Sequence, residues 1–337
     1  MTQSITTLAQ LAAALDVSPS TVSRALAGNV AISVATRQRI VALAAEHGFQ
    51  PNQQARNLRL GRTQAIGVVL PMGHETGQHP SDPFFITMLG HLADALTARG
   101  YDLLLTRVIP TDTAWLDRLI DSGRVDGVIV IGQSDQVDAL DRAARRFAPL
   151  VVWGARLEGA ATTTVGSDNA LGGRAAAEHL LALGRRRLAF FGNPEAPEIT
   201  QRHAGFAAAC AAAGTTAELL PVHLIADLAY PMIADRLDRQ RAPDGILAAS
   251  DTIAMMAIRA LAERRLRVPE DVAVIGYDDV ALAAHTTPPL TTMRQDVARG
   301  AALLVELLFR KLAGETVEPI VLTPELIVRG SSVVNQL

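Results

Sequence analysis

The sequence predicts an α/β protein, with a small all-helical unit at its N-terminal end followed by two doubly wound α/β subdomains. In residues 1–50, apolar side chains recur at helical spacing between capping residues. From Ala65 onward, short apolar runs alternate with helical segments, which is the pattern of parallel β-α-β units. The alternation occurs in two successive sets, so we expect two sheets.

Two short helices joined by a tight turn are predicted near the start of the chain. Thr7 and Gln10 have the spacing of a capping box, which begins the first helix. Ser18 caps the second helix, Pro19 occupies its first position and Gly28 ends it. The pair has the form of a helix-turn-helix, whose second helix enters the major groove in proteins that bind DNA. The alternative is a small helical module that binds protein or only packs.

The second of these helices is amphipathic. Val22, Ala25 and Leu26 form its apolar face. The opposite face carries small hydrogen-bonding side chains and one arginine: Ser20, Thr21, Ser23 and Arg24. A guanidinium can contact one guanine with two hydrogen bonds, so Arg24 is the predicted base-reading residue.

A third helix is expected from a Ser33 cap to about His47. Thr36 and Arg37 lie in its first turns, where they can contact the phosphate backbone. Its inward side chains are expected to be Ile40, Val41, Leu43 and Ala44.

Residues 51–63 are expected to form a hinge. Asn52 can cap a short helix over about 53–60, which is unstable alone in water because about 12–15 residues are needed. Arg56 and Arg59 supply positive charge, and Leu58 is an apolar side chain able to open a base step in the minor groove. The alternative is a flexible basic linker in which Leu58 packs on a neighbouring domain.

Charge divides the chain in the same way. Residues 1–62 contain six arginines and two carboxylates, whereas the remainder contains 25 basic and 32 acidic side chains. The N-terminal part therefore has a net charge of +4 and the rest −7. A basic end on an acidic body favours nucleic-acid contact at that end.

Length and composition are typical of a folded soluble protein of two or three domains, with 337 residues, 49% apolar and 19% charged. No stretch approaches the roughly 18 apolar residues of a membrane span, and the N-terminus has no signal-peptide pattern. We therefore expect a cytoplasmic protein without membrane contact. Cys210 is the only cysteine, which excludes an intrachain disulfide, and we expect it in the core.

The elements of the two subdomains are predicted from the apolar runs. Strands are expected at 65–70, 102–105, 127–131 and 150–153, and then at 188–191, 245–249 and 272–276. Helices are expected near 85–99, 112–122, 136–146, 170–184, 200–213, 229–240 and 252–266. Ligands of such sheets bind at the carboxyl ends of the strands, so we expect a cleft there.

No catalytic motif is found. The sequence has no phosphate-binding loop, no nucleophile elbow and no paired-histidine zinc motif, so no enzyme activity, cofactor or metal is predicted. His74 and His79 share a loop and are expected to be solvated rather than metal ligands. Asp278 and Asp279 are adjacent at a strand end, where neighbouring side chains point apart.

Nine motifs follow one another in an order that is found in a known family. They lie at residues 8–12, 17–26, 51–59, 82–85, 125–129, 165–169, 275–279, 288–295 and 324–331, and include Ile275-Gly276-Tyr277-Asp278-Asp279. Together they resemble the LacI/GalR family of bacterial transcription regulators over nearly the whole chain. The resemblance implies a homodimer that binds a near-palindromic operator in double-stranded DNA.

The resemblance also implies which residues contact DNA. Ser20 and Arg24 match base-reading positions, Pro19 offers no side-chain donor there, and Leu58 matches the hinge side chain in the minor groove. The DNA-binding residues carried over are Thr7, Ser18, Pro19, Ser20, Thr21, Ser23, Arg24, Asn29, Thr36, Arg37, Asn52, Arg56, Leu58 and Arg59.

The body resembles a periplasmic sugar-binding protein. The family pattern implies a headpiece over 1–50, a hinge over 51–63, a first subdomain over 64–163 and 293–322, and a second over 164–292 and 323–337. The effector-binding residues carried over are Phe84, Phe85, Trp153, Arg202, Ser250, Asp278 and Gln295.

These residue types suit a carbohydrate, because aromatic faces stack on the apolar side of a pyranose while Arg202 and Asp278 can bind its hydroxyls. Each of these side chains can instead have a purely structural role. Trp153 can belong to the core, Arg202 can pair with a surface acid, and Phe84 and Phe85 can simply pack the helix that they open.

The chain departs from the family pattern in three places. Ser250-Asp251 stands where many members carry Asn followed by Asp, and Tyr230-Pro231 replaces an aromatic-plus-glycine pattern. A leucine-rich C-terminal helix, which makes some members tetramers, is not seen after 328–331, so a dimer is expected.

The predicted function is a repressor of a sugar-uptake or catabolism operon, controlled by a mono- or disaccharide that acts as inducer through the hinge. A co-repressor role with a non-sugar metabolite such as a purine stays open. So does a sugar-binding protein with vestigial enzymatic activity, in which Asp251 and Asp278 would be the acid–base pair. A plain sugar receptor would keep the body but not residues 1–63.

Overall fold

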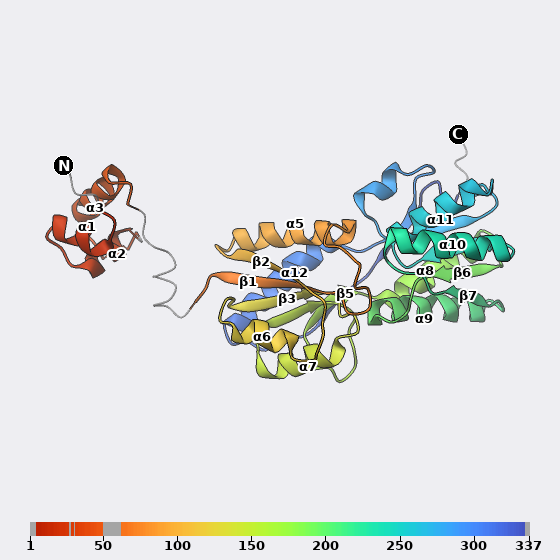
Figure 1. Cartoon of the computed structure of the whole chain (residues 1–337), viewed down its shortest axis with the longest axis horizontal. Coiled ribbons are helices and arrows are strands. Elements are labelled where there is room, and N and C mark those ends of the chain that lie inside the picture. Colours follow the sequence, from red (N-terminus) through yellow and green to blue (C-terminus); the bar gives the residue numbers. More distant parts are fainter. Residues whose placement is uncertain (1–4, 27, 30, 50–61, 334–337) are drawn as a thin grey trace. The chain divides into compact units, whose positions relative to one another are not determined.

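The computed structural model describes residues 5–26, 28–29, 31–49 and 62–333 (Figure 1). Contacts divide the chain into a unit that ends at Thr63 and a larger unit that begins at Gln64. Within the described ranges, no helix combines the length and the apolar character that crossing a membrane requires.

The first unit consists of three short helices, α1 (Leu8–Ala14), α2 (Pro19–Leu26) and α3 (Val34–Glu46). All three predicted caps are present. Thr7 and Gln10 form the capping box, Ser18 Oγ accepts the Thr21 N–H at 3.1 Å, and Ser33 Oγ accepts the Thr36 N–H at 3.2 Å. The buried side chains that hold the helices together are Leu11, Ala12, Val22, Ala25, Ile40 and Ala44.

One inward side chain was predicted wrongly. Val41 is 48% exposed, because it follows the buried Ile40 and therefore lies about 100° further around α3. The predicted hinge helix, with Asn52, Arg56, Leu58 and Arg59, lies outside the described residues and stays a prediction.

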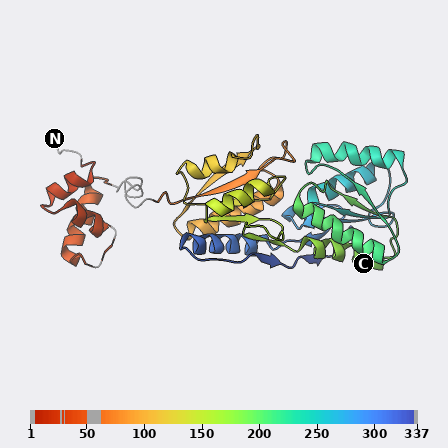
Figure 2. The same ribbon diagram turned by 90° about the horizontal axis from the view of Figure 1, so that it is seen from below.

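The second unit contains two six-stranded sheets, each covered by helices on both faces (Figures 1 and 2). We call the sheets with their helices the first lobe and the second lobe. The first sheet is entirely parallel, in the order β2-β1-β3-β4-β5-β11. Its strands are β1 (Ala65–Pro71), β2 (Asp102–Val108), β3 (Gly127–Ile131), β4 (Leu150–Trp153), β5 (Thr164–Ser167) and β11 (Ile320–Leu322).

The second sheet repeats this strand order as β7-β6-β8-β9-β10-β12, except that β12 runs antiparallel to β10. Its strands are β6 (Leu188–Phe191), β7 (Ala217–Leu220), β8 (Gly245–Ala248), β9 (Ala273–Asp278), β10 (Thr291–Arg294) and β12 (Glu325–Ile327).

The helices divide between the lobes. The first lobe holds α5 (Pro83–Thr97), α6 (Trp115–Asp121), α7 (Val137–Arg146) and α12 (Val297–Leu312). The second holds α8 (Asn169–Ala182), α9 (Pro197–Ala212), α10 (Ala226–Arg239), α11 (Asp251–Glu263) and the short 3-10 helix η1 (Ala281–His285).

Successive side chains of each strand point to opposite faces of the first sheet, which gives the first lobe two core layers. Ile129 and Ile131 of β3 pack with α5 and α12, whereas Val128 and Val130 face the layer containing α6 and α7. The second lobe has one large core, which includes the fully buried Cys210, as predicted.

The lobe boundary expected at residue 164 is wrong by one strand. Residues 164–167 form β5, which pairs with β4 and β11 of the first sheet, so the chain passes to the second lobe only after Ser167. The return follows β10, which ends at Arg294, rather than residue 292. A strand this short, with a glycine and two hydroxyl side chains, has no apolar run that would predict it.

Candidate ligand pocket and DNA-binding helix

A cavity lies where the carboxyl ends of the two sheets face each other. The strand order reverses between β1 and β3 in the first lobe and between β6 and β8 in the second. Ligands of doubly wound sheets bind at such reversals, because the loops after the two strands diverge there. Segments that follow these four strands contribute to the lining, among them His74, Ser134, Ala196 and Ser250.

The structure brings together all the residues that the family pattern assigned to an effector. Phe84, Phe85, Trp153, Arg202, Ser250, Asp278 and Gln295 line this one cavity. They come from both lobes and from the segment that joins them.

The aromatic part of the wall belongs to the first lobe. Phe84 lies in the first turn of α5, and its ring centroid is 6.3 Å from that of Trp153 at the end of β4. Trp153 is 3% exposed and also belongs to the core, where its ring packs so closely on Gly300 of α12 that a Cβ there would clash with it. Phe85 is largely buried and serves mainly to pack α5.

Arg202 of α9 is held from three sides. Its Nε donates to Asn169 Oδ1 at 2.8 Å, its Nη1 donates to the Ala249 carbonyl at 2.7 Å, and the guanidinium lies 3.7 Å from the centroid of the Tyr277 ring. The alternative in which Arg202 pairs with a surface acid is wrong, since these partners fix it at 7% exposure. The guanidinium is therefore positioned before any ligand arrives.

Asp278 and Gln295 form the neighbouring polar part of the wall. Gln295 Nε2 donates to Asp278 Oδ1 at 2.7 Å. Burial raises the pKa of Asp278 to about 7, and the charge of Arg202 partly opposes this shift. Asp278 also has a backbone φ of 114°, a conformation that an aspartate adopts only under strain and that is enriched at functional sites.

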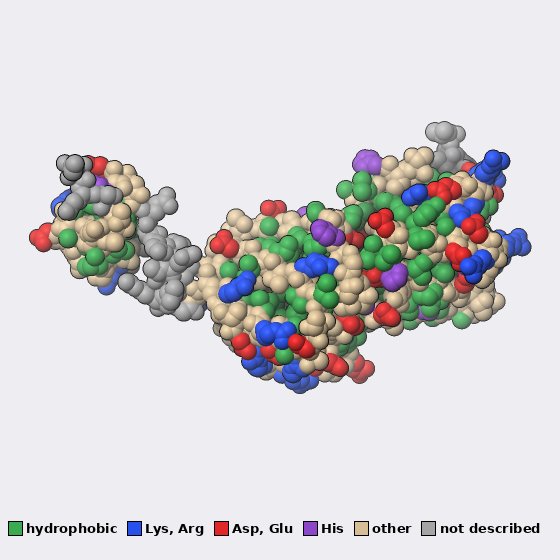
Figure 3. All heavy atoms as spheres, in the orientation of Figure 1, with side chains coloured by type: hydrophobic (Ala, Val, Ile, Leu, Met, Phe, Trp, Pro, Cys, Tyr) green, Lys and Arg blue, Asp and Glu red, His purple; other side chains and the backbone are tan. Residues whose placement is uncertain are grey.

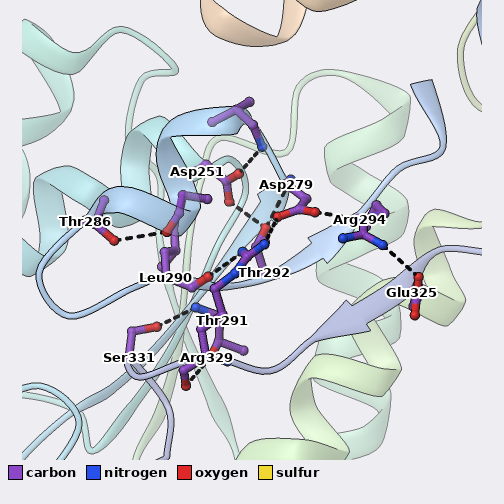
Figure 4. A network of polar contacts seen from close by, with 12 residues as sticks. Asp251, Asp279, Thr286, Leu290, Thr291, Thr292, Arg294, Glu325, Arg329 and Ser331 are labelled. Carbon is purple, nitrogen blue, oxygen red and sulfur yellow. Dashed lines mark hydrogen bonds and ion pairs between the residues drawn. The ribbon is translucent and has the colours of Figure 1, made fainter. Parts of the chain in front are cut away.

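The side chain of Asp279 turns away from the cavity, as predicted. Its carboxylate binds Arg294 Nε and Arg329 Nη2, each at 2.7 Å (Figure 4). Asp251 lies behind the wall and is fully buried, accepting the Thr292 hydroxyl at 2.6 Å and the Val280 N–H at 2.8 Å. Because Asp251 does not line the cavity, it is not placed to act with Asp278 as an acid–base pair on a ligand.

Three titratable groups of this wall were not predicted from the sequence. Asp82 caps α5 by accepting the Phe84 N–H at 3.0 Å, and Glu198 accepts the Gln133 N–H of the other lobe at 3.1 Å. Burial raises the pKa of both carboxyls. His74, expected to be solvated, instead lines the cavity and bonds to Ser134 at 2.6 Å. The sequence did place His74 and Ser134 just after strands, where ligands of such sheets bind. It did not show that these two strands are neighbours in the sheet.

The predicted recognition helix presents its polar face to solvent. Ser18 Oγ lies 2.8 Å from Ser20 Oγ and 2.9 Å from Thr21 Oγ1, so three hydroxyls form one exposed cluster at the start of α2. Arg24 is exposed on the last turn. Arg37 Nη1 donates to the Gly28 carbonyl at 3.5 Å, which holds α3 to the end of α2.

Many charged side chains of the second unit form ion pairs. Figure 3 shows acidic and basic side chains lying side by side over α6 and α7, where Arg142 and Arg146 bind Asp117. Such a surface has little net attraction for DNA phosphates.

A helix-turn-helix unit followed by a two-lobed body with a pocket at its strand ends defines a DNA-binding regulator with a ligand-binding domain. Residues 7–52 match the family model of bacterial regulatory proteins of the lacI family, and residues 177–332 match the periplasmic binding protein-like domain. The HTH-type transcriptional regulator CelR of Thermobifida fusca is 32% identical over 96% of this chain and 98% of its own. The chain therefore belongs to the LacI family of transcriptional regulators.

Solved structures agree with this assignment. A transcriptional regulator CelR–cellobiose complex covers 97% of this chain and 100% of its own at 30% identity, with a TM-score of 0.70. The lac repressor dimer bound to operator and the anti-inducer ONPF covers 97% and 99% at 25% identity, with a TM-score of 0.86. The HTH-type transcriptional repressor PurR of Photobacterium profundum is 27% identical over 96% of this chain and 98% of its own.

Proposed function

We propose that this regulator is a cytoplasmic repressor of a sugar-uptake or catabolism operon, and that a mono- or disaccharide in the cavity releases it from DNA. The observation that carries the proposal is the composition of the cavity wall. Phe84 and Trp153 offer aromatic faces, while Arg202, Asp278 and Gln295 offer hydrogen-bond donors and acceptors. A pyranose has an apolar face and a rim of hydroxyls, and this wall is complementary to both.

A neutral sugar fits the charges of the wall better than a phosphorylated one. Three carboxyl groups line the cavity, those of Asp82, Glu198 and Asp278. The positive charge of Arg202 faces them, but its guanidinium already donates hydrogen bonds to Asn169 and the Ala249 carbonyl. A phosphate would add negative charge beside these carboxyls. Cellobiose is a reasonable first candidate, since it is the ligand named for the CelR complex.

The DNA-binding part of the proposal assigns α2 to the major groove of a near-palindromic operator. Arg24 reads a guanine, Arg37 contacts phosphate, and Leu58 of the hinge enters the minor groove. The remaining proposed contacts are Thr7, Ser18, Pro19, Ser20, Thr21, Ser23, Asn29, Thr36, Asn52, Arg56 and Arg59.

A palindromic operator requires two copies of the chain. Two apolar side chains that the homodimer would cover are Ile86 on α5 and Leu282 on η1, which are 56% and 57% exposed. Each lobe of the body would thereby contribute to the interface. Sugar binding changes the angle between the first lobes of the two protomers, and this changes the spacing of the two hinges. The coupling free energy equals the difference in sugar-binding free energy between the state that binds DNA and the state that does not. A tenfold preference of the sugar for one of them corresponds to about 1.4 kcal/mol.

A purine co-repressor is the second candidate, because the chain is similar to a repressor named PurR and because Phe84 and Trp153 could also stack on a base. A thermal-shift screen of the whole protein separates the two. Cellobiose, maltose, D-glucose and hypoxanthine are added in turn, and a ligand at 100 times its Kd stabilises by about 2.7 kcal/mol. A rise in Tm with a sugar supports a sugar as the effector, whereas a rise with hypoxanthine alone overturns it.

Two arginine variants test the DNA assignment. Arg24→Ala should weaken a palindromic promoter fragment by about 1–3 kcal/mol while leaving random DNA nearly unchanged, because a base contact is lost. Arg37→Ala should weaken both alike, because a phosphate contact is lost. Equal losses on both DNAs for Arg24→Ala would refute the base-reading role.

A further inference from the structure

We infer that Lys311, in the last turn of α12, is an acylation site: its side-chain amine accepts an activated acyl group, and this releases the end of the helix from the segment that leads into β5. Neither the ligand of the cavity nor the operator enters into this proposal. It goes beyond the proposed function by adding a site of covalent modification.

Lys311 is the single lysine among the 31 lysine and arginine residues of the chain. A guanidinium keeps its proton under all conditions in which a protein is folded, so it has no lone pair with which to attack a carbonyl. A lysine amine can lose its proton, and lysine is accordingly the target of acetylation. Any side-chain amide that an acyl donor forms with this protein is therefore formed at Lys311.

The amine of Lys311 is half-buried without a counter-charge. Its Nζ donates to Thr163 Oγ1 at 3.0 Å, and none of the carboxylates in the described part of the chain forms an ion pair with it. The adjacent Arg310, by contrast, binds Glu315 Oε2 at 2.8 Å. A neutral hydroxyl stabilises a cation less than a carboxylate does. Burial accordingly lowers the pKa of Lys311, so that more of this amine is neutral than that of a solvated lysine.

The reaction needs the neutral amine and an acyl phosphate or acyl thioester. Nζ attacks the carbonyl carbon, a C–N bond forms, and the bond from that carbon to the phosphate oxygen or the thiolate sulfur breaks. The phosphate or thiolate leaves with the electron pair, and the nitrogen gives one proton to water. Partial removal from water activates a lysine nucleophile, whereas a side chain that is only half-buried stays within reach of a donor.

Acylation weakens the interactions that hold this end of α12. Thr163 is 5% exposed, and its carbonyl accepts the Val152 N–H at 3.0 Å, so it is a fixed part of the first lobe. An amide at Nζ carries no charge and loses the favourable interaction of a cation with the C-terminal end of a helix. The added acyl group also needs room beside the buried Thr163. We therefore expect the last turn of α12 to separate from Thr163.

Competition for an acyl donor tests the site. The whole protein and an unstructured peptide with one lysine are mixed in equal amounts at neutral pH, with acetyl phosphate in one arm and acetyl-coenzyme A in the other. Peptide mapping by mass spectrometry follows both amides. We expect Lys311 to be acetylated at least about threefold faster than the peptide lysine in one or both arms, because its amine is partly desolvated. The arm that reacts identifies the class of donor.

The same mixture in urea is the control, because unfolding exposes Lys311 to water. The two lysines should then react at equal rates. A rate for Lys311 in the folded protein that is no faster than that of the peptide in either arm overturns the proposal.

Two variants test the effect on α12. Lys311→Gln carries a neutral amide, as the acylated side chain does, whereas Lys311→Arg keeps the positive charge and cannot be acylated. We expect the Tm of Lys311→Gln to lie about 1–3 °C below that of Lys311→Arg. Acetylated wild-type protein should shift in the same direction as Lys311→Gln. Equal Tm values for the two variants and for acetylated protein would overturn the release of the helix.

Both experiments are done without sugar or DNA. Their outcome therefore leaves the proposed function untouched.

Discussion

The two lobes of the body have the same strand order but line the cavity with different chemistry. The first lobe supplies the aromatic rings, beside the polar Asp82 and His74, and Trp153 is placed by packing against α12. The second lobe supplies Arg202 and Asp278, which hydrogen bonds hold in place. One topology therefore gives two kinds of wall, and the side chains at the strand ends decide which.

The difference extends behind the wall. In the second lobe Asp251, Thr291, Thr292 and Ser331 are fully or almost fully buried and bonded to one another or to nearby backbone (Figure 4). Such a network is rigid when it is complete, and removing one member leaves its partners unsatisfied. Substitutions in the second lobe should thus change stability and binding together, whereas those in the aromatic wall should change mainly binding.

The largest effect is expected for Arg202→Ala. The Asn169 side chain and the Ala249 carbonyl lose their donors, so the free energy of unfolding should fall by about 2–4 kcal/mol. Cellobiose binding should be lost as well. Urea unfolding and calorimetry measure both, with Arg174→Ala on the exposed face of α8 as control. An unfolding free energy equal to that of the control would contradict the comparison.

Asp278→Asn should make the body more stable at high pH. Burial raises the pKa of Asp278 to about 7, so the folded protein holds this proton more tightly than the unfolded chain. The stability that this proton contributes is present at low pH and is lost as the pH rises toward 7. Asparagine has no proton to lose, so the gain of the variant over wild type should grow by about 2–3 kcal/mol between pH 5 and pH 8. The exposed Asp94→Asn serves as control, and a gain independent of pH would be inconsistent with this account.

Phe84→Leu tests the aromatic wall. The substitution removes the ring that lies 6.3 Å from Trp153 and keeps an apolar side chain at the start of α5. Affinity for cellobiose should fall about three- to tenfold, because stacking contributes about 0.5–1.5 kcal/mol. The unfolding free energy should change little. A large loss of stability with unchanged affinity would mean that Phe84 only packs the helix.

The smallest effect is expected for a contact between the two lobes that lies outside the ligand cavity. Glu75 of the first lobe accepts the Leu224 N–H of the second at 3.1 Å and lies 3.1 Å from His223 Nδ1. Glu75→Gln keeps one acceptor oxygen for the Leu224 N–H and loses the second, so sugar affinity should fall only about two- to threefold, as for the loss of one hydrogen bond. Glu178→Gln, exposed on α8, is the matched control. A tenfold loss would show that this contact matters as much as the aromatic wall.

The sequence predicted the central strands and the caps, because these depend on local patterns. The runs 127–131, 150–153 and 188–191 coincide with β3, β4 and β6, and Ser18 and Ser33 cap their helices. The strands β5, β7, β10, β11 and β12 were missed, because short half-polar segments become strands only where a neighbouring strand is there to pair with.

The cavity was predicted in part for a similar reason. The family pattern carried over Arg202 and Asp278, but their fixed partners Asn169 and Ala249 depend on how α8, α9 and β8 pack. His74 and Ser134 are 60 residues apart, and only the pairing of β1 with β3 makes them neighbours. A residue whose role depends on strand order cannot be recognised from its own surroundings in the chain.

The central claim is that a sugar between the lobes weakens the grip of the helix-turn-helix on its operator. Fluorescence anisotropy with a labelled palindromic promoter fragment tests it, using whichever panel sugar raises the Tm most. The account predicts at least a tenfold loss of operator affinity at saturating sugar, which corresponds to about 1.4 kcal/mol of coupling. Operator affinity that is unchanged or tighter in the presence of that sugar would contradict it.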